Sequence, residues 1–206
     1  NATFYVQHVN KYLKTPSQAV QLYVNKTNNV VNDNNHPKHN LCNTSIILRS
    51  DGKYVLNVRE VSYYFVIDWN FYDYDGVIDT KNHIVELEPE QLNSLFDGDK
   101  TVLPSTVITY ASEDLVPKYE PAIPGLEDLL LVEYQGALRT VATARATNPT
   151  KINEMVLCRL NSSYQVDKLL RLKVNWSDKE EEKNSWCQKN WVPFVRDNEL
   201  FILYSS

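Results

Sequence analysis

The residues in this chain that could do chemistry are mainly acids, because the sequence offers no metal-binding or nucleophilic pattern. Four His and three Cys residues are present, and neither set has the spacing of metal ligands. The chain has no glycine-rich phosphate loop, no Gly-x-Ser-x-Gly motif and no paired Cys and His nucleophile arrangement. We therefore expect no metal and no cofactor. The acids remain, among them the adjacent pair Glu127 and Asp128.

Composition excludes two further classes of function. The net charge of −5 and a pI near 5.4 argue against a nucleic-acid-binding protein, which needs a dense basic face. No apolar stretch approaches the roughly 20 residues that span a bilayer. With 43% hydrophobic and 23% charged residues, the chain is expected to fold around an ordinary core.

The cysteines indicate a cellular compartment. Their number is odd, and Cys158 follows the apolar run Met155-Val156-Leu157. This pattern suits buried thiols in a reducing environment, which favours the cytoplasm, with a virion as the alternative location.

Three segments share one pattern, an apolar run, a turn and a second apolar run; they are 45–58, 128–142 and 191–204. Their central pairs Asp51-Gly52, Gln135-Gly136 and Asp197-Asn198 tolerate the positive φ of a two-residue hairpin turn. Each segment is therefore predicted to form a β-hairpin.

Further strands are predicted at 62–68, 83–87, 154–160 and 169–174, where aromatic and β-branched residues gather. The order of hairpin, strand and strand is typical of the four-stranded antiparallel blades of a β-propeller. We expect an all-β fold of this kind, with residues 1–206 as a single propeller-like domain that forms part of a longer chain.

Few other elements are expected. Residues 88–96 are predicted to form a short helix, with Pro89 at its start, and residues 17–24 a second one. The Asn-rich stretch 25–40 has little to bury and is predicted to be a polar loop.

A family resemblance rests on several motifs in order: Ser45-Ile46-Ile47, Asp51-Gly52-Lys53-Tyr54, 56–64, Gly125-Leu126-Glu127-Asp128, and Glu182-Lys183 followed by 189–194. From about Asn43 onward, the chain resembles five-bladed propellers of the glycoside hydrolase and glycoside phosphorylase type, found in viral and microbial sugar-handling proteins. The resemblance implies a sugar site at the axial end of the propeller.

The resemblance also assigns roles to individual residues. Asp128 would be the leading catalytic or sugar-binding acid, with Glu127 beside it, because cleavage of a glycosidic bond needs an acid and a separately placed base or nucleophile. Asn57, Arg59 and Asn190 would line the same mouth, and Trp191 would contact the sugar. Three of these residues have an alternative role. Asp128 would simply open a strand, Arg59 would form a buried ion pair, and Trp191 would pack in the core.

The functional expectation is a carbohydrate-active module that binds or cleaves a glycan. The family's acidic pair is followed by a basic residue, whereas Leu129-Leu130-Leu131 follows here, so the charge that orients the substrate is missing. The alternative is a non-catalytic interaction or structural module of a larger assembly, with a protein partner or an additional chain completing its sheet edges.

Overall fold

The structure is a computed structural model that describes residues 22–24, 30–32, 41–61, 64–65, 71–72, 80–96, 101–119, 125–173 and 191–203. These residues are mostly in strands, with one α-helix, α2 (Pro89–Phe96), and one short 3₁₀ helix, η1 (Glu113–Leu115). The all-β class predicted from the sequence is confirmed. None of the described helices is both long and apolar enough to cross a membrane.

The described strands are β1 (Leu22–Val24), β2 (Val30–Asn32), β3 (Leu41–Leu48), β4 (Tyr54–Val61), β5 (Tyr64–Phe65), β6 (Phe71–Tyr72), β7 (Thr80–Leu87), β8 (Thr101–Leu103), β9 (Thr106–Val107), β10 (Thr109–Tyr110), β11 (Leu126–Tyr134), β12 (Ala137–Ala144), β13 (Glu154–Leu160), β14 (Gln165–Arg171), β15 (Val192–Arg196) and β16 (Glu199–Leu203).

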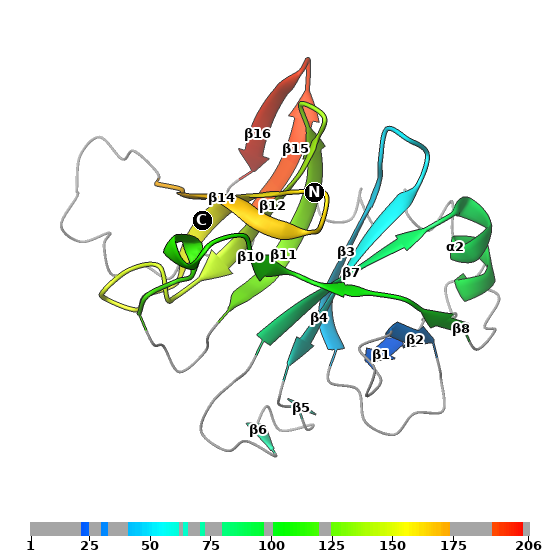
Figure 1. Cartoon of the computed structure of the whole chain (residues 1–206), viewed down its shortest axis with the longest axis horizontal. Coiled ribbons are helices and arrows are strands. Elements are labelled where there is room, and N and C mark those ends of the chain that lie inside the picture. Colours follow the sequence, from blue (N-terminus) through cyan, green and yellow to red (C-terminus); the bar gives the residue numbers. More distant parts are fainter. Residues whose placement is uncertain are drawn as a thin grey trace.

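Two larger sheets dominate the described part of the chain. One has the strand order β3-β4-β7-β9, and the other the order β10-β14-β13-β12-β11. Smaller sheets contain β1-β2-β8, β5-β6 and β15-β16. The four-stranded sheet lies between the five-stranded sheet on one side and α2 with β8 on the other (Figure 1).

A single extended segment joins the two large sheets. Thr106 of β9 pairs with Ile84 of β7, and three residues later Thr109 of β10 pairs with Gln165 of β14, in parallel. Between these strands, the Ile108 amide donates to the Asn82 carbonyl at 2.8 Å. The same stretch of backbone is therefore an edge of both sheets.

Both faces of the four-stranded sheet are buried. One face contributes Val55 and Ile84 to a core shared with Leu129, Leu131 and the rest of the five-stranded sheet. The other face packs Leu56, Val58, Val85 and Leu87 against Leu95 of α2 and Leu103 of β8. This two-sided burial explains why five consecutive residues of β4, Val55 to Arg59, are buried, a pattern that one-sided strands do not show.

The predicted helix at 88–96 is confirmed as α2. Its start is fixed locally: Pro89 occupies the first helical position, and the Gln91 side chain accepts a hydrogen bond from the Glu88 amide at 2.9 Å. This hydrogen bond, one half of a capping box, satisfies a backbone donor that the helix itself cannot pair.

All three predicted hairpins are confirmed, as β3-β4, β11-β12 and β15-β16. The pairs Gln135-Gly136 and Asp197-Asn198 have positive φ at both residues, as predicted. The first turn differs. Only Gly52 has a positive φ there, and the Arg49 amide bonds to the Lys53 carbonyl, so the loop contains three residues.

The propeller prediction is wrong, and with it the resemblance to glycosidase propellers. A propeller requires equivalent sheets arranged around an axis. Here the three hairpins belong to sheets of four, five and two strands, and no closed or propeller-like arrangement is formed by the described residues. The five-stranded sheet contains four antiparallel strands that follow one another in the sequence, β11 to β14. In the four-stranded sheet, β3 and β4 are followed by β7 and then by β9, which belongs to the segment that both sheets share.

Two local predictions near the start of the chain are also corrected. Residues 22–24, expected within a helix, form β1, and residues 30–32, expected within the polar loop 25–40, form β2. The pairing of β1 with β2, and of β2 with β8, supplies backbone hydrogen bonds that a loop or a short isolated helix would lack.

Gly125 provides a test of how closely the two large sheets meet. Its φ is +95°, and a Cβ at this position would lie 2.8 Å from the Thr80 carbonyl oxygen of β7. We expect Gly125→Ala to lower the free energy of unfolding by about 2–4 kcal/mol, combining backbone strain with steric overlap. Urea unfolding monitored by circular dichroism measures this change.

Gly136→Ala is the matched control. Gly136 has a φ of +66° and open space around the position of a Cβ, so only the strain of about 1 kcal/mol is expected. Equal losses for the two variants would contradict the close approach.

Candidate functional site

The main candidate site is a buried group of charges where the two large sheets meet. The Arg59 guanidinium of β4 donates from Nη1 to Asp128 Oδ1 at 2.8 Å and from Nη2 to Glu127 Oε2 at 3.1 Å. The side chains of Arg59, Glu127 and Asp128 are 4%, 7% and 14% exposed. Burial of one cation is therefore compensated by two carboxylates from the other sheet.

Irregular backbone is what brings both acids to the same partner. Neighbouring residues of a regular strand point to opposite faces of the sheet. The register of β11 shifts between Glu127 and Leu130, and Asp128 has a φ of +51°. This bulge turns the Asp128 side chain toward Arg59 together with that of Glu127.

A second bulge faces the first. In β3 the register shifts between Cys42 and Ser45, and Asn43 has a φ of +49°. The Asn43 side-chain amide donates a hydrogen bond to the Asp128 carboxylate. Asn43 and Asp128, two non-glycine residues with left-handed backbone, thus contact each other. Strained backbone of this kind often occurs at functional sites.

Side-chain amides extend the polar group along the face of the four-stranded sheet. Asn57 Nδ2 donates to Asn82 Oδ1 at 3.2 Å, and Asn82 Nδ2 donates to the Leu126 carbonyl at 2.8 Å. Asn57 and Asn82 are buried. They link the middle strands of one sheet to the first residue of β11 in the other.

Four buried side-chain atoms in this group have no hydrogen-bond partner among the residues that the structure describes: Asn57 Oδ1, Arg59 Nε, Thr80 Oγ1 and Glu127 Oε1. Buried polar atoms are ordinarily paired, so a concentration of unpaired ones indicates a place where another polar molecule fits. The set contains a donor, two acceptors and a hydroxyl.

A second arginine lies at the more exposed side of the group. Arg145 Nε is 3.8 Å from Glu127 Oε1 and donates a hydrogen bond to Asn153, and its side chain is 31% exposed. Together with Arg59 it balances the charges of Glu127 and Asp128. The group as a whole is therefore close to neutral.

The structure brings together only part of the set of residues that the sequence analysis assigned to one site. Those that lie together are Asn57, Arg59, Glu127 and Asp128. Trp191 lies elsewhere, 5% exposed and packed with Val141 and Met155, so its indole offers no open face to a sugar. Asn190 lies outside the described residues.

Other members of the group were not predicted: Asn43, Thr80, Asn82, Arg145 and Asn153. Asn82 carried no distinct signal, because it is one of several polar residues in the strand β7. The positions of Asn43 and Arg145 depend on bulges and on contacts between sheets, for which the sequence contains no local signal.

His83 forms a separate polar contact on the opposite face of the four-stranded sheet. Its Nε2 lies 3.0 Å from Glu60 Oε2 and its Nδ1 lies 3.3 Å from Ser105 Oγ. The acid, imidazole and hydroxyl types match those of hydrolase sites, but the ring is completely buried and both of its nitrogens already have a partner. We interpret it as a structural link between β4, β7 and the loop before β9.

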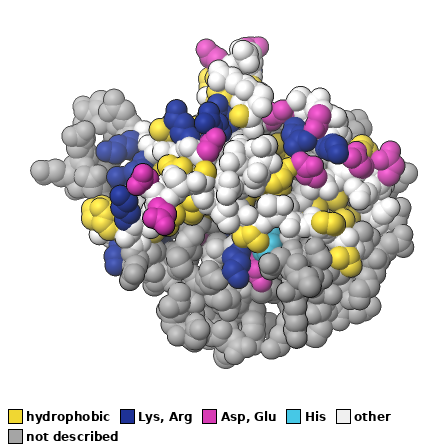
Figure 2. All heavy atoms as spheres, viewed as in Figure 1, with side chains coloured by type: hydrophobic (Ala, Val, Ile, Leu, Met, Phe, Trp, Pro, Cys, Tyr) yellow, Lys and Arg dark blue, Asp and Glu magenta, His cyan; other side chains and the backbone are white. Residues whose placement is uncertain are grey.

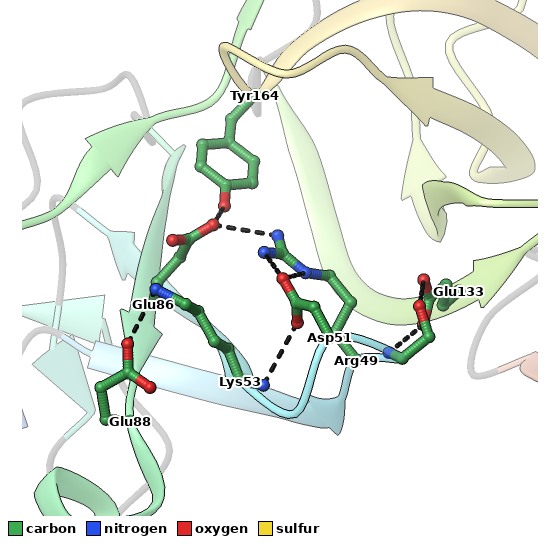
Figure 3. A network of polar contacts seen from close by, with 8 residues as sticks. Arg49, Asp51, Lys53, Glu86, Glu88, Glu133 and Tyr164 are labelled. Carbon is green, nitrogen blue, oxygen red and sulfur yellow. Dashed lines mark hydrogen bonds and ion pairs between the residues drawn. The ribbon is translucent and has the colours of Figure 1, made fainter.

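A third polar network closes the other end of the interface between the sheets (Figure 3). Arg49, next to the first hairpin turn, bonds to Asp51 and to Glu86 of β7, while Tyr164 of the β13-β14 turn donates to Glu86. Ser50 donates from its amide and hydroxyl to Glu133 of β11, both at 2.6 Å.

These contacts shift several pKa values. The hydrogen bond from Tyr164, and then Arg49, lower the pKa of Glu86. Arg49 holds the pKa of Asp51 down at about 2. Burial, followed by the hydrogen bond to Glu86, raises the pKa of Tyr164 to about 12. The network is fully paired and partly exposed, so we assign it a structural role.

Nothing among the described residues suggests a metal centre, since no three His, Cys, Asp or Glu side chains come together there in a way that could hold an ion. The thiol of Cys158 is free and buried, and burial raises its pKa to about 12. This thiol is therefore not a nucleophile at neutral pH.

Comparisons with protein-family models, with curated proteins and with solved structures found no match to this chain. The functional argument therefore depends on the site alone.

Replacing Arg59 tests the charge group. Arg59→Met leaves two buried carboxylates without their cation, and we expect a loss of about 3–5 kcal/mol in the free energy of unfolding. The triple variant Arg59→Met, Glu127→Gln, Asp128→Asn removes all three charges and should regain most of this loss. Denaturant unfolding measures both.

Arg159→Met is the control, because Arg159 is 43% exposed and pairs with Asp167 on the surface of the sheet. It should change stability by less than about 1 kcal/mol. If Arg59→Met had an equally small effect, the buried ion pair would not stabilise the fold.

The pH dependence of stability tests the third network. Because the folded pKa of Glu86 is lowered, its contribution is present at neutral pH and is lost as pH falls through that pKa. Because the folded pKa of Tyr164 is raised to about 12, its contribution is present below the ordinary value near 10 and is lost between pH 10 and 12.

Tyr164→Phe should therefore cost about 1 kcal/mol at pH 7 and flatten the decline in stability between pH 10 and 12. Thermal unfolding across pH measures this. Tyr119→Phe, at an exposed tyrosine, should leave the alkaline decline as in the parent protein. A Tyr164→Phe variant with an unchanged alkaline decline would refute the assignment.

Proposed function

We propose that this chain is a non-catalytic binding module for a neutral, hydroxyl-rich ligand of the carbohydrate class, bound at the group of charges between the two large sheets. The observation that carries the proposal is the gathering of unpaired buried polar atoms there. They are Asn57 Oδ1, Arg59 Nε, Thr80 Oγ1 and Glu127 Oε1.

Hydroxyl groups fit this set chemically. A sugar hydroxyl accepts a hydrogen bond from Arg59 Nε and donates one to Asn57 Oδ1 or Glu127 Oε1, because it has one proton and two lone pairs. The set contains both donors and acceptors, which a ligand with acceptors only, such as a phosphate, does not match.

The balance of charge supports a neutral ligand. Arg59 and Arg145 are offset by Glu127 and Asp128, so the site has no excess charge to attract an anion or a cation. An anionic ligand would also have to displace an existing carboxylate from Arg59.

A ligand would approach from the side of the exposed and partly exposed residues. Asn43 is exposed, Arg145 is 31% exposed and the Asp128 side chain is 14% exposed, whereas Asn57 and Arg59 are buried. Direct contacts in the bound state would therefore involve Asp128 and Arg145 first, with the deeper atoms completing the hydrogen bonds.

Catalysis is left out of the proposal because both acids are already engaged. Glycosidic cleavage requires one carboxyl group to protonate the leaving oxygen and a separately placed one to act as base or nucleophile. Glu127 and Asp128 share one guanidinium, and the residues that directly follow them are Leu129-Leu130-Leu131, with no arginine among them.

Binding to neutral oligosaccharides tests the proposal. We expect a glycan array followed by calorimetry to find a neutral oligosaccharide, and Asp128→Asn or Arg145→Met to weaken its affinity by about 10-fold or more, the loss typical of a hydrogen bond to a charged group. Asn tolerates the left-handed backbone of residue 128, so Asp128→Asn changes the charge and leaves the bulge in place.

Arg159→Met, remote from the charge group, should bind as the parent protein does. If no neutral glycan binds, or if Asp128→Asn and Arg145→Met both retain full affinity, the proposed site is wrong. Preferential binding of sulfated or sialylated glycans would also contradict the neutral ligand.

A further inference from the structure

The hairpin β15-β16 has one packed face and one open face, which follow from its register. Across the pair, Pro193 lies opposite Ile202 and Val195 opposite Leu200 on one face. Pro193 is buried, and Ile202 packs against the core cluster of Val141, Met155 and Trp191. Pro193 and Ile202 attach this face to the rest of the protein, whereas Val195, nearer the turn, is 40% exposed.

The opposite face, here called the front face, consists of three cross-strand pairs: Val192 with Leu203, Phe194 with Phe201, and Arg196 with Glu199. The four apolar side chains are 40% to 61% exposed. The Phe194 and Phe201 rings stack with centroids 5.4 Å apart and an interplanar angle of 18°. A contiguous apolar ladder is thus presented to solvent, which is typical of a contact surface.

The hairpin also stands out from the body of the molecule. It projects at the top of Figure 1, and the projection at the same place in Figure 2 shows acidic side chains at its tip and hydrophobic ones below. Arg196 and Glu199, the pair next to the turn, end the apolar ladder with one charge of each sign.

We propose that the front face is the interface with a second copy of this chain, related by a two-fold axis that runs parallel to the hairpin between the two copies. Such an axis places β15 of each copy opposite β16 of the other. Val192 then meets the partner's Leu203, Phe194 meets the partner's Phe201, and Arg196 meets the partner's Glu199.

Self-complementarity of charge is what selects a second copy. Arg196 lies 3.3 Å from Asp197 of its own turn, and its side chain is 77% exposed. In this arrangement each Arg196 also faces a Glu199 of the partner, so both charges of the front face are matched twice over the same interface. With the two hairpins antiparallel, the charged pair would lie over Val192 and Leu203 and be desolvated without a partner. A purely acidic or purely basic peptide would leave one of the two charges unmatched.

The surface is small, which sets the strength of association. Three cross-strand pairs cover much less than the roughly 800 Å² per partner of a standard interface, so we expect a dissociation constant on the order of 10–100 μM. The inference stands independently of the proposed carbohydrate site, because the two surfaces share no residue.

Analytical ultracentrifugation over a range of concentrations tests the proposal. The parent protein should shift from monomer to dimer with increasing concentration, and Phe194→Thr with Phe201→Thr should remain monomeric. Thr keeps a high strand propensity, so the hairpin is retained while its apolar surface is lost. NMR spectra confirm that the hairpin is intact.

Charge reversal gives the sharper result. R196E places acids opposite acids, and E199R places bases opposite bases, so each variant alone should be at least 10-fold weaker in self-association. An equimolar mixture of the two should recover dimers, because one copy then presents only acids and the other only bases. The double variant R196E with E199R should also associate as the parent does.

Arg159→Glu, a reversal at an exposed strand residue away from the hairpin, should leave association unchanged. Asp128→Asn should do the same, which keeps this test separate from that of the carbohydrate site. A parent protein that stays monomeric at all concentrations overturns the proposal. So does association that survives both charge reversals, or a mixture that recovers no dimer.

Discussion

The buried charge of Arg59 is the constraint on which the arrangement of the two large sheets depends. The guanidinium of an arginine whose side chain is 4% exposed has to be compensated where it lies, and its compensation comes from Glu127 and Asp128 of the other sheet. The two sheets can therefore adopt only relative positions in which β11 presents both acids to β4. The bulge at Asp128 and the facing bulge at Asn43 are the local distortions that make this geometry reachable.

Three kinds of interaction follow one another along the interface between the sheets. The Arg59 group lies at one end, an apolar core that includes Val55, Ile84 and Leu129 lies in the middle, and the Arg49 network lies at the other end. The apolar middle supplies most of the driving force, because it is the part that removes apolar surface from water. The polar ends specify orientation, since a shift by one residue would leave their charges unpaired.

Local patterns in the sequence predicted local structure well. The three hairpins and α2 were predicted because turn residues and helix caps act over a few positions, and Gln135-Gly136 and Asp197-Asn198 show the predicted backbone. The Glu127-Asp128 pair and its neighbours Asn57 and Arg59 were also identified, although the role assigned to them came from the propeller resemblance, which is wrong.

The assembly of these elements was not predictable in the same way. Nothing local in the sequence shows that the residues after Leu103 would complete one sheet and then join another, or that the third hairpin would form a sheet of its own. Positive φ at Asn43 and Asp128 was equally hidden, because both residue types occur in ordinary strand backbone as well. Trp191 shows the same limit, since a tryptophan next to a strand suits a core and a sugar platform equally well.

The segment from Thr106 to Tyr110 makes the two large sheets one mechanical unit. Since its backbone serves as an edge for both, residues inserted beside Ile108 would detach β9 from β10 and separate the sheets, whereas residues inserted at the exposed Gln135-Gly136 turn would only lengthen a loop. Tolerance of the chain to changes in length should therefore be lowest in a short, apparently irregular stretch, and highest at the tips of its most regular hairpins.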